Sequence, residues 1–301
     1  MTSIEVVRPG ALTTIQDLGR PGFAHIAVPR SGAADPPSLR LANALTGNEP
    51  GAAALEITLA GPALRFDGAA LIALTGAPAP ASIDGRPVAF GEPVAVGAGE
   101  VLDVGQASAG VRTYIAVGGG IDVEPVLASR ATDTLTGLGP APLRRGDVLA
   151  LGRPADGADR PGGGAVRDTD LAAAGVRPTD SGAFARPLLR ILAGPRADLF
   201  APSALAALTL EPFAVSPTSN RVGVRLTGPR LERRDTGELP SEGLVHGAIQ
   251  VPTSGEPILM LADHPTTGGY PVIAVVVESD HGLAGQLRPG TAVRFALVQR
   301  W

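Results

Sequence analysis

Short apolar runs, each bounded by glycine, proline, aspartate or asparagine, recur along the whole chain and restrict what it can fold into. They are rich in valine and isoleucine, which favours extended strands over helices. Glycine (40 residues) and proline (29 residues) supply most of the breaks. The runs are Ile4–Val7, Leu55–Leu59, Ala70–Leu74, Val94–Val96, Val111–Val117, Leu188–Leu192, Val222–Leu226 and Thr291–Val298.

Helical patterns are scarce by comparison. Ser38–Leu45 follows two prolines, Ala197–Ala207 is rich in alanine and leucine, and Glu124–Ala128 is a short third candidate. These helices do not alternate with the strands, as they would around a parallel sheet. The sequence therefore predicts a mainly β protein with few short helices, whose antiparallel sheets close into barrels or sandwiches.

Residues 153–177 are polar, rich in glycine and proline and without periodicity, which is typical of an exposed linker or long loop. A chain of 301 residues also exceeds what one hydrophobic core usually supports. We therefore expect an N-terminal β subdomain over residues 1–155, a linker over 156–178 and a C-terminal β subdomain over 179–301.

All 25 basic residues are arginine. A chain without lysine has no Walker A lysine, no Schiff-base lysine and no lysine to which biotin could be attached. The absence of cysteine excludes disulfides, thiolate zinc sites and a cysteine nucleophile. ATP binding by a P-loop and covalent biotin are thus excluded from this chain.

The balance of charge and aromatic residues argues against a nucleic-acid surface, because the net charge is −4 and only seven Phe, two Tyr and one Trp are present. The longest apolar runs are well short of the ~20 residues that a membrane span requires. The first 20 residues lack the basic and apolar segments of a signal peptide. We expect a cytoplasmic protein that acts on neither nucleic acid nor membrane.

Polar groups, glycines and strand-like runs are concentrated between Pro240 and Pro271. Leu244–Val251, Pro257–Ala262 and Tyr270–Val277 are predicted as three strands joined by turns. The second turn carries Asp263, His264, Thr266, Thr267, Gly268 and Gly269.

Two successive glycines can free backbone amides to form a small anion-binding concavity, and the alternative is a glycine-rich hairpin loop with capping hydroxyls. The anion hypothesis makes Gly269→Ala severe if Gly269 has a positive φ.

The N-terminal segment Pro9–Asp35 is dense in turn residues and contains Gln16, Asp17, Arg20, Ser31 and Asp35. Asp17 and Arg20 either form a buried ion pair that pins the loop, or Arg20 recognises a carboxylate with its two-pronged guanidinium. Both interpretations stay open from the sequence.

The segment Ser216–Gly228 joins a polar loop to a strand and carries Arg221 and Arg225 four residues apart. On a strand these positions share a face but lie ~13 Å apart, so both cannot clamp one small anion without a bend. Ser219 and Asn220 are common turn formers, which is the alternative to a binding role.

The four histidines are His25, His246, His264 and His281. Their spacing matches no metal-ligand motif, so we expect no metal site. His264, adjacent to Asp263 in the loop, is the better candidate for proton transfer. The chain also lacks a GxSxG elbow, and Gly118–Gly120 leads into no clear helix, which disfavours serine-hydrolase and dinucleotide-binding functions.

Seven segments of the chain carry a resemblance to a known family: VRPGALTTIQDLGRPGFAHIAVPRSGAADPPSLRLANALTGN, ALTGA, YIAVGGGIDVEPVLASRATDT, SPTSNRVGVRLTG, SEGLVHGAIQVPTSGEPILMLAD, TTGGYPVIA and QLRPG. Together they resemble the biotin-dependent carboxyltransferase-like family, which includes allophanate hydrolase subunit 2 proteins, the C-type subunits of prokaryotic 5-oxoprolinases and part of urea carboxylase. The resemblance runs in order from about Ile4 to Phe295.

The resemblance implies two cyclophilin-like β-barrel subdomains and a homologous B-type partner, also known as allophanate hydrolase subunit 1. In the oxoprolinase branch, the B-type and C-type proteins join an A-type protein to open 5-oxo-L-proline to L-glutamate with ATP hydrolysis. In the urea carboxylase branch, a carboxyl group moves from carboxybiotin on another domain to urea. A third possibility within the family is a regulatory, non-catalytic role.

The chain departs from the family pattern at three positions. Pro78 stands where relatives usually have Asp, Pro265 where they have Gln, and Ala34 where they have Met. Proline offers no side-chain hydrogen bond, so a changed substrate or a low activity follows if the missing groups contact substrate.

From the residues and the resemblance together, we expect the C-type component of a 5-oxoprolinase that acts on a small amide or lactam. The expected catalytic residues are Asp263, His264 and Arg221. The expected substrate-binding residues are Ser219, Asn220, Ser241, Glu242, Gln250, Thr266, Thr267, Gly268, Gly269 and Tyr270. The expected supporting residues are Gln16, Asp17, Arg20, Ser31 and Asp35.

Overall fold

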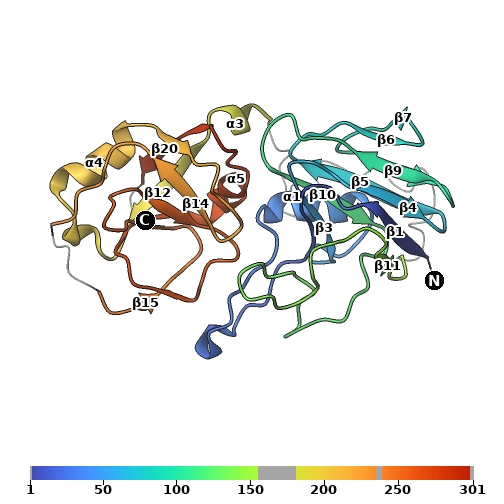
Figure 1. Cartoon of the computed structure of the whole chain (residues 1–301), viewed down its shortest axis with the longest axis horizontal. Helices are drawn as coiled ribbons and strands as arrows, with labels where there is room; N and C mark the ends of the chain where they lie inside the picture. The colour runs from blue at the N-terminus through green and yellow to red at the C-terminus, as the bar shows by residue number, and fades with distance from the viewer. Residues whose placement is uncertain (1, 155–180, 235–238, 299–301) are drawn as a thin grey trace. The chain divides into compact units, whose positions relative to one another are not determined.

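The computed structural model describes residues 2–154, 181–234 and 239–298. The chain divides into two compact units (Figure 1). The first comprises Met1–Arg20 and Asp35–Ser181, and the second comprises Pro21–Ala34 and Gly182–Trp301. The linker expected over residues 156–178 lies outside the described residues.

The first unit is built of two antiparallel sheets that share one core. Its elements are β1 (Ser3–Arg8), β2 (Thr13–Gln16), α1 (Pro36–Leu45), β3 (Ala54–Thr58), β4 (Ala63–Phe66), β5 (Ala70–Gly76), β6 (Ala81–Ile83), β7 (Arg86–Pro87), β8 (Pro93–Val96), β9 (Val101–Val104), β10 (Arg112–Val117) and β11 (Val148–Ala150). The sheet orders are β11-β1-β4-β9-β6-β7 and β2-β3-β10-β5-β8. Apolar residues of both sheets, such as Phe66 and Ile115, form a single buried cluster, which makes this unit a sandwich.

Helix α1 packs against β5 and β10. It begins at Pro36 because Asp35 is its N-cap: the Asp35 carboxylate accepts hydrogen bonds from the backbone N–H of Ser38 (3.2 Å) and from its hydroxyl (2.7 Å). Asp35, expected near a binding site, therefore has a local structural role.

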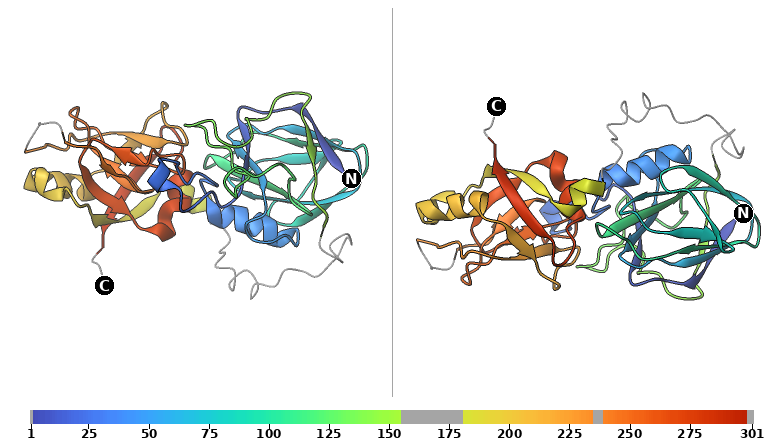
Figure 2. Two further views of the ribbon diagram at one scale, coloured as in Figure 1. Left: turned by 90° about the horizontal axis from the view of Figure 1, so that it is seen from below. Right: turned by 90° about the horizontal axis from the view of Figure 1, so that it is seen from above.

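The second unit contains a closed barrel of seven strands, drawn mainly in yellow to red in Figure 2. Its order is β12-β19-β16-β17-β14-β13-β20, and the pair β12/β20 is parallel. The elements are η1 (Ala24–Ile26), α3 (Ser181–Ala185), β12 (Leu188–Ala193), η2 (Ala197–Leu199), α4 (Pro202–Leu210), β13 (Phe213–Val215), β14 (Gly223–Thr227), β15 (Glu242–Gly243), β16 (Ala248–Gln250), β17 (Ile258–Met260), β18 (Thr267–Gly268), β19 (Val272–Val276), η3 (Glu278–Asp280), α5 (His281–Gly285) and β20 (Ala292–Leu297). Alternate barrel residues point inward to one apolar cluster that includes Phe213 and Phe295.

The mainly β prediction is confirmed, and each predicted strand is found within a few residues of its expected position. The helix expected over Ala197–Ala207 is split, because Pro202 starts α4 after the short η2 turn. The helix expected at Glu124–Ala128 is wrong. Leu127 and Ala128 both have positive φ (51° and 61°), so the chain forms a tight turn between Val126 and Ser129.

The segment 21–34 belongs to the second unit although it lies between two parts of the first. Hydrogen bonds hold it there: Nη2 of Arg221 donates to the Gly32 carbonyl (2.5 Å), and Oγ of Ser31 donates to Asp263 (2.6 Å). Ser31 has a φ of 51°, in the left-handed region. Among the described residues, no helix has the length and apolar character to cross a bilayer.

Candidate functional site

Strand pairing explains why Arg221 and Asp263 meet. β14 and β17 are antiparallel partners, with Gly223 opposite Met260. The residues just before β14 and just after β17 therefore emerge at the same end of the pair. The backbone N–H of Asp263 donates to the Arg221 carbonyl at 3.1 Å, which extends the pairing to the two side chains.

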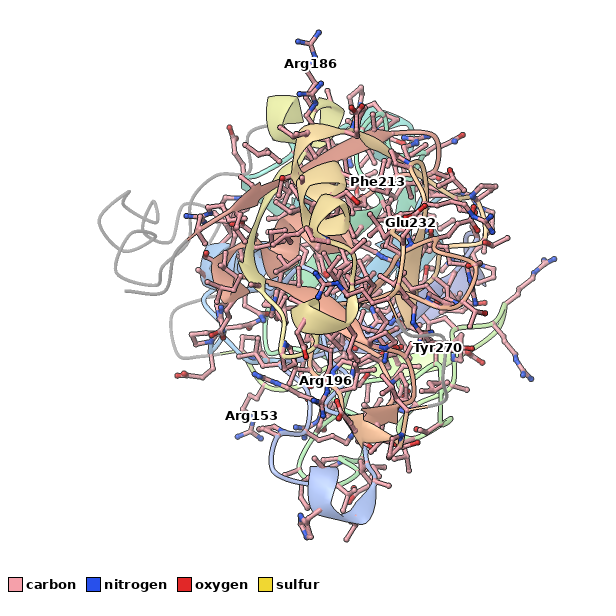
Figure 3. The ribbon with its side chains drawn as sticks, turned by 90° about the vertical axis from the view of Figure 1, so that its left-hand side faces the viewer. Arg153, Arg186, Arg196, Phe213, Glu232 and Tyr270 are labelled. Carbon is pink, nitrogen blue, oxygen red and sulfur yellow. The ribbon has the colours of Figure 1, made fainter. Side chains whose placement is uncertain are left out.

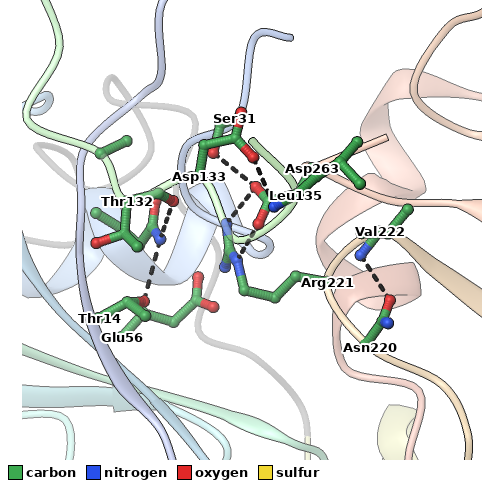
Figure 4. A network of polar contacts seen from close by, with 12 residues as sticks. Thr14, Ser31, Glu56, Thr132, Asp133, Leu135, Asn220, Arg221, Val222 and Asp263 are labelled. Atoms are coloured by element: carbon green, nitrogen blue, oxygen red, sulfur yellow. Dashed lines mark hydrogen bonds and ion pairs between the residues drawn. The ribbon is translucent and has the colours of Figure 1, made fainter. Parts of the chain in front are cut away.

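Arg221 and Asp263 form a buried, two-pronged ion pair (Figure 4). Nε of Arg221 lies 2.9 Å from Oδ2 of Asp263, and Nη2 lies 3.1 Å from Oδ1. Both side chains are excluded from solvent. Ser31 donates to the same carboxylate. The buried charges of Arg221 and Asp263 are therefore paired with each other, and their remaining hydrogen bonds reach the segment that contains Ser31 and Gly32.

Three histidines gather beside this pair. His264 follows Asp263 directly, His246 precedes β16 and His281 starts α5. The rings of His246 and His281 stack with centroids 4.0 Å apart, and the centroids of His246 and His264 are 6.2 Å apart. The sequence shows that Asp263 and His264 are adjacent, but it does not predict that His246 and His281 lie beside them.

The tautomer of His264 follows from its hydrogen bond. Nδ1 lies 2.8 Å from the Pro265 carbonyl oxygen, which can only accept, so Nδ1 carries the proton. Burial lowers the pKa of His264 below its usual value, opposed by the Pro265 carbonyl and by the charge of Asp263. The neutral ring then presents an unprotonated Nε2, which suits a proton acceptor.

A small two-stranded ribbon, β15 with β18, joins Glu242 to Gly268 and Gly243 to Thr267. The Thr266 carbonyl accepts from the backbone N–H of Leu244 at 2.8 Å. Ser241 and Thr267 are exposed beside it. The loop is therefore a paired ribbon and not a set of unpaired amides, which favours the hairpin alternative.

Side chains also hold the ribbon in place. Glu242 forms a two-pronged ion pair with Arg196, which Figure 3 labels, and this hydrogen bonding lowers the pKa of Glu242. Nε2 of the buried Gln250 donates to the Tyr270 carbonyl at 2.9 Å, while Tyr270 as a whole is 48% exposed. Arg196 carried no signal in the sequence.

The glycine pair does not have the conformation that the anion hypothesis needs. Neither Gly268 nor Gly269, both within the described part of the chain, adopts a positive φ. A Cβ on Gly269 would meet only the Leu239 carbonyl, at 3.7 Å. A Cβ on Gly268 would lie 2.6 Å from Nε2 of Gln250, so the close approach occurs one residue earlier.

Ser219 and Asn220 are used by the turn before β14. Oδ1 of Asn220 accepts from the backbone N–H groups of Val222 (2.9 Å) and Gly223 (3.2 Å). Oγ of Ser219 accepts from the backbone N–H of Arg225 at 3.1 Å. These contacts match the turn-former interpretation and place both residues next to Arg221 in a supporting role.

The remaining expected residues belong to the first unit. Asp17 accepts from Gly19, Ser129 and Arg130, and Arg20 donates to the Ala131 carbonyl at 2.5 Å. The suggested Asp17–Arg20 ion pair is not formed among the described residues. Each side chain instead holds the loop around residues 126–131.

Gln16 is fully buried in β2 and donates to the Thr132 carbonyl at 2.9 Å. Within the second unit, the structure brings together Arg221, Asp263, His264 and Ser31. In the parts of the chain that are described, no three acidic or histidine side chains are arranged as metal ligands.

The architecture and the matching sequence define a carboxyltransferase-type protein. A family model described as "Carboxyltransferase domain, subdomain A and B" matches residues 26–297, and the chain belongs to this family. It is 39% identical over 295 residues to the C subunit of the 5-oxoprolinase of Escherichia coli (strain K12), covering 97% of this chain and 90% of that protein.

Solved structures with the same fold are longer than this chain. TTHA0988 superimposes with a TM-score of 0.84 at 37% identity, covering 98% of this chain and 56% of that chain. The urea carboxylase of Kluyveromyces lactis gives a TM-score of 0.87 at 31% identity, covering 99% of this chain and 27% of that chain. The family expected from the sequence is thereby confirmed.

Proposed function

We propose that this chain is the C-type component of an ATP-hydrolysing 5-oxoprolinase, which opens 5-oxo-L-proline to L-glutamate together with A-type and B-type partners. The observation that carries this proposal is the match to a 5-oxoprolinase C subunit over nearly the full length of both chains. The urea carboxylase match covers only about a quarter of that much longer protein.

Opening a lactam breaks the ring C–N bond, adds oxygen from water to the carbonyl carbon and gives the nitrogen a proton. A neutral imidazole can accept the proton from water and pass it to the leaving nitrogen. In our proposal Nε2 of His264 has this role, because Nδ1 is held by the Pro265 carbonyl. Arg221 and Asp263 act through their buried pair, which fixes the backbone on both sides of His264.

Substrate binding is assigned to the ribbon next to this group. Ser241, Thr266 and Thr267 offer hydroxyls, and Tyr270 offers an exposed ring. ATP is used by the complex, and this chain, which has no lysine, cannot supply a P-loop for it. Biotin, if it takes part in a related reaction, arrives on another chain for the same reason.

The test is reconstitution of the complex from separately purified A-type, B-type and C-type proteins. We expect 5-oxoproline-dependent release of phosphate and glutamate only when this chain is present, and loss of turnover in His264→Gln. His25→Gln is the matched control, because His25 is exposed and bonds the nearby Gly22 carbonyl. Full activity without this chain would overturn the proposal.

The second candidate is carboxyl transfer to urea or a related amide. It is favoured by the superposition on urea carboxylase. In this case the complex would consume urea with a biotinylated carboxylase and leave 5-oxoproline unchanged. Stable co-elution with a B-type partner, but no turnover of either compound, would identify a regulatory role.

A further inference from the structure

Three of the four histidines lie together in the second unit, although they are far apart in the sequence. Two have a fixed hydrogen bond: His264 through Nδ1 to Pro265, and His281 through Nε2 to the Val276 carbonyl at 3.2 Å. His246 lies between them and differs from both. Its Nε2 is buried and has no hydrogen-bond partner among the described residues.

Gly247 allows this arrangement. Its φ of +83° is in the left-handed region, and a Cβ there would lie 2.6 Å from Nε2 of His281. The same glycine ties two strands together, donating to the Met260 carbonyl (2.9 Å) and accepting from Val276 (2.8 Å). The backbone is therefore shaped so that the His281 ring can lie flat against His246.

We infer that His246 and His281 form a stacked wall that fixes the ring of His264 and shields the side of it next to His246 from bulk water while leaving Nε2 to the reacting water molecule, which makes them positioning residues for proton transfer at Nε2 of His264. This inference rests on the proposed role of His264. The wall acts through the stacked faces of the two rings, so it requires no hydrogen bond from His246. This explains why the buried Nε2 of His246 has no hydrogen-bond partner among the described residues.

The charges around the cluster agree with a set of neutral rings. Burial, together with the positive charges of protonated His281, protonated His264, Arg30 and Arg221, lowers the pKa of His246 to about 2. Burial also lowers the pKa of His281, opposed by the Val276 carbonyl, Glu278 and Asp280. Asp263 is the carboxylate nearest His264 in sequence, and its charge is shared with Arg221.

Substitutions of His246 can separate the effect of its stacked ring from the effect of its ability to take up a proton. His246→Ala removes the stacked ring and admits water, so the pKa of His264 should rise toward the ordinary value of about 6.5. His246→Phe keeps an apolar ring of similar breadth and should restore the wild-type value. His25→Ala is the control, because His25 is exposed and lies outside the stacked cluster.

Nitrogen-15 NMR of the histidine rings in the full chain reports tautomer and pKa for each residue without any need for turnover. We expect His264 protonated at Nδ1 in wild type, a higher pKa of His264 in His246→Ala, and the wild-type pKa again in His246→Phe. The acid limb of the kcat profile of the reconstituted complex should move to higher pH by the same amount in His246→Ala.

An unchanged tautomer and pKa of His264 in a folded His246→Ala protein would overturn the inference, as would a wild-type His264 protonated at Nε2. His281→Ala is a second route if His246→Ala does not fold: it removes the other ring of the wall and should likewise raise the pKa of His264, and an unchanged pKa in the folded variant would overturn the inference. If the complex turns over no 5-oxoproline, the proposed function fails, whereas the NMR result still decides whether the wall exists.

Discussion

The His281 ring occupies the space that a side chain on Gly247 would need: a Cβ on residue 247 would lie 2.6 Å from Nε2 of His281 and 2.9 Å from the Val276 carbonyl oxygen. Gly247→Ala combines this overlap with a φ of +83°, and we expect the free energy of unfolding to fall by about 2–3 kcal/mol. Urea unfolding measures it. Gly243→Ala, which meets nothing within 4 Å, is the control and should change little.

Replacing Arg221 by lysine should reduce stability as well as activity. Lysine keeps the charge but cannot bridge both oxygens of Asp263 and the Gly32 carbonyl. Breaking a buried pair typically costs about 3–5 kcal/mol, and the conservative change should cost a large part of that. Arg225→Lys, four residues away on an exposed position, is the matched control for urea unfolding. A wild-type unfolding midpoint for Arg221→Lys would contradict the role given to the pair.

The two glycines of the ribbon should behave differently. Gly269→Ala is expected to be tolerated, because the added Cβ would make only an ordinary contact with the Leu239 carbonyl (3.7 Å) and the φ is not positive. Gly268→Ala should displace the Gln250 amide from the Tyr270 carbonyl and cost about 1 kcal/mol. Thermal unfolding and turnover of both variants test this order, and a more severe Gly269→Ala would restore the anion-loop hypothesis.

Stability should fall on mild acidification. Burial holds the folded-state pKa values of His246, His264 and His281 below the unfolded value of about 6.5. Below that pH the unfolded chain binds more protons than the folded chain, so the contribution is full above about 6.5 and decreases as pH falls toward the folded values. The slope is at most about 1.4 kcal/mol per pH unit for each histidine.

Urea unfolding between pH 7.5 and pH 5 measures the slope. His246→Phe should flatten it, because that ring cannot take up a proton in the unfolded chain. His25→Phe removes an exposed histidine and should leave it as in wild type. A pH-independent midpoint in wild type would show that the cluster is already hydrated.

Pro265→Gln tests the main departure from the family pattern. The carbonyl that accepts from His264 belongs to the backbone of residue 265 and survives the change. The new amide adds a donor and an acceptor that proline lacks. If the chain retains the proposed reaction, turnover of 5-oxoproline by the reconstituted complex should rise. Equal steady-state rates would show that the amide is dispensable here.

The strands could be predicted because bounded valine- and isoleucine-rich runs depend on local chemistry. Pairing partners could not, because the register of β14 against β17 depends on the whole barrel. For this reason Arg221 and Asp263 were both candidates from the sequence, but their ion pair was not foreseen. The repeat of two glycines does not show which of them meets Gln250, so the close approach at Gly268 could not be predicted from the sequence.

The supporting loop shows a second limit. Ser31 and Asp35 are four residues apart, yet they belong to different units and have different partners. A change of unit within a loop leaves no periodic pattern. The buried polar contacts that hold this part of the loop in the second unit join residues that are distant in the sequence: Ser31 and Asp263, for example, are 232 positions apart.

This separation has a consequence during synthesis of the chain. At roughly 5–20 residues per second, Asp263 leaves the ribosome about 12–46 s after Ser31. Throughout that interval the segment 21–34 emerges without the carboxylate and guanidinium that later bind it, while the strands on either side can already pair. The nascent chain thus carries an open loop that closes only when the last third of the protein has been made.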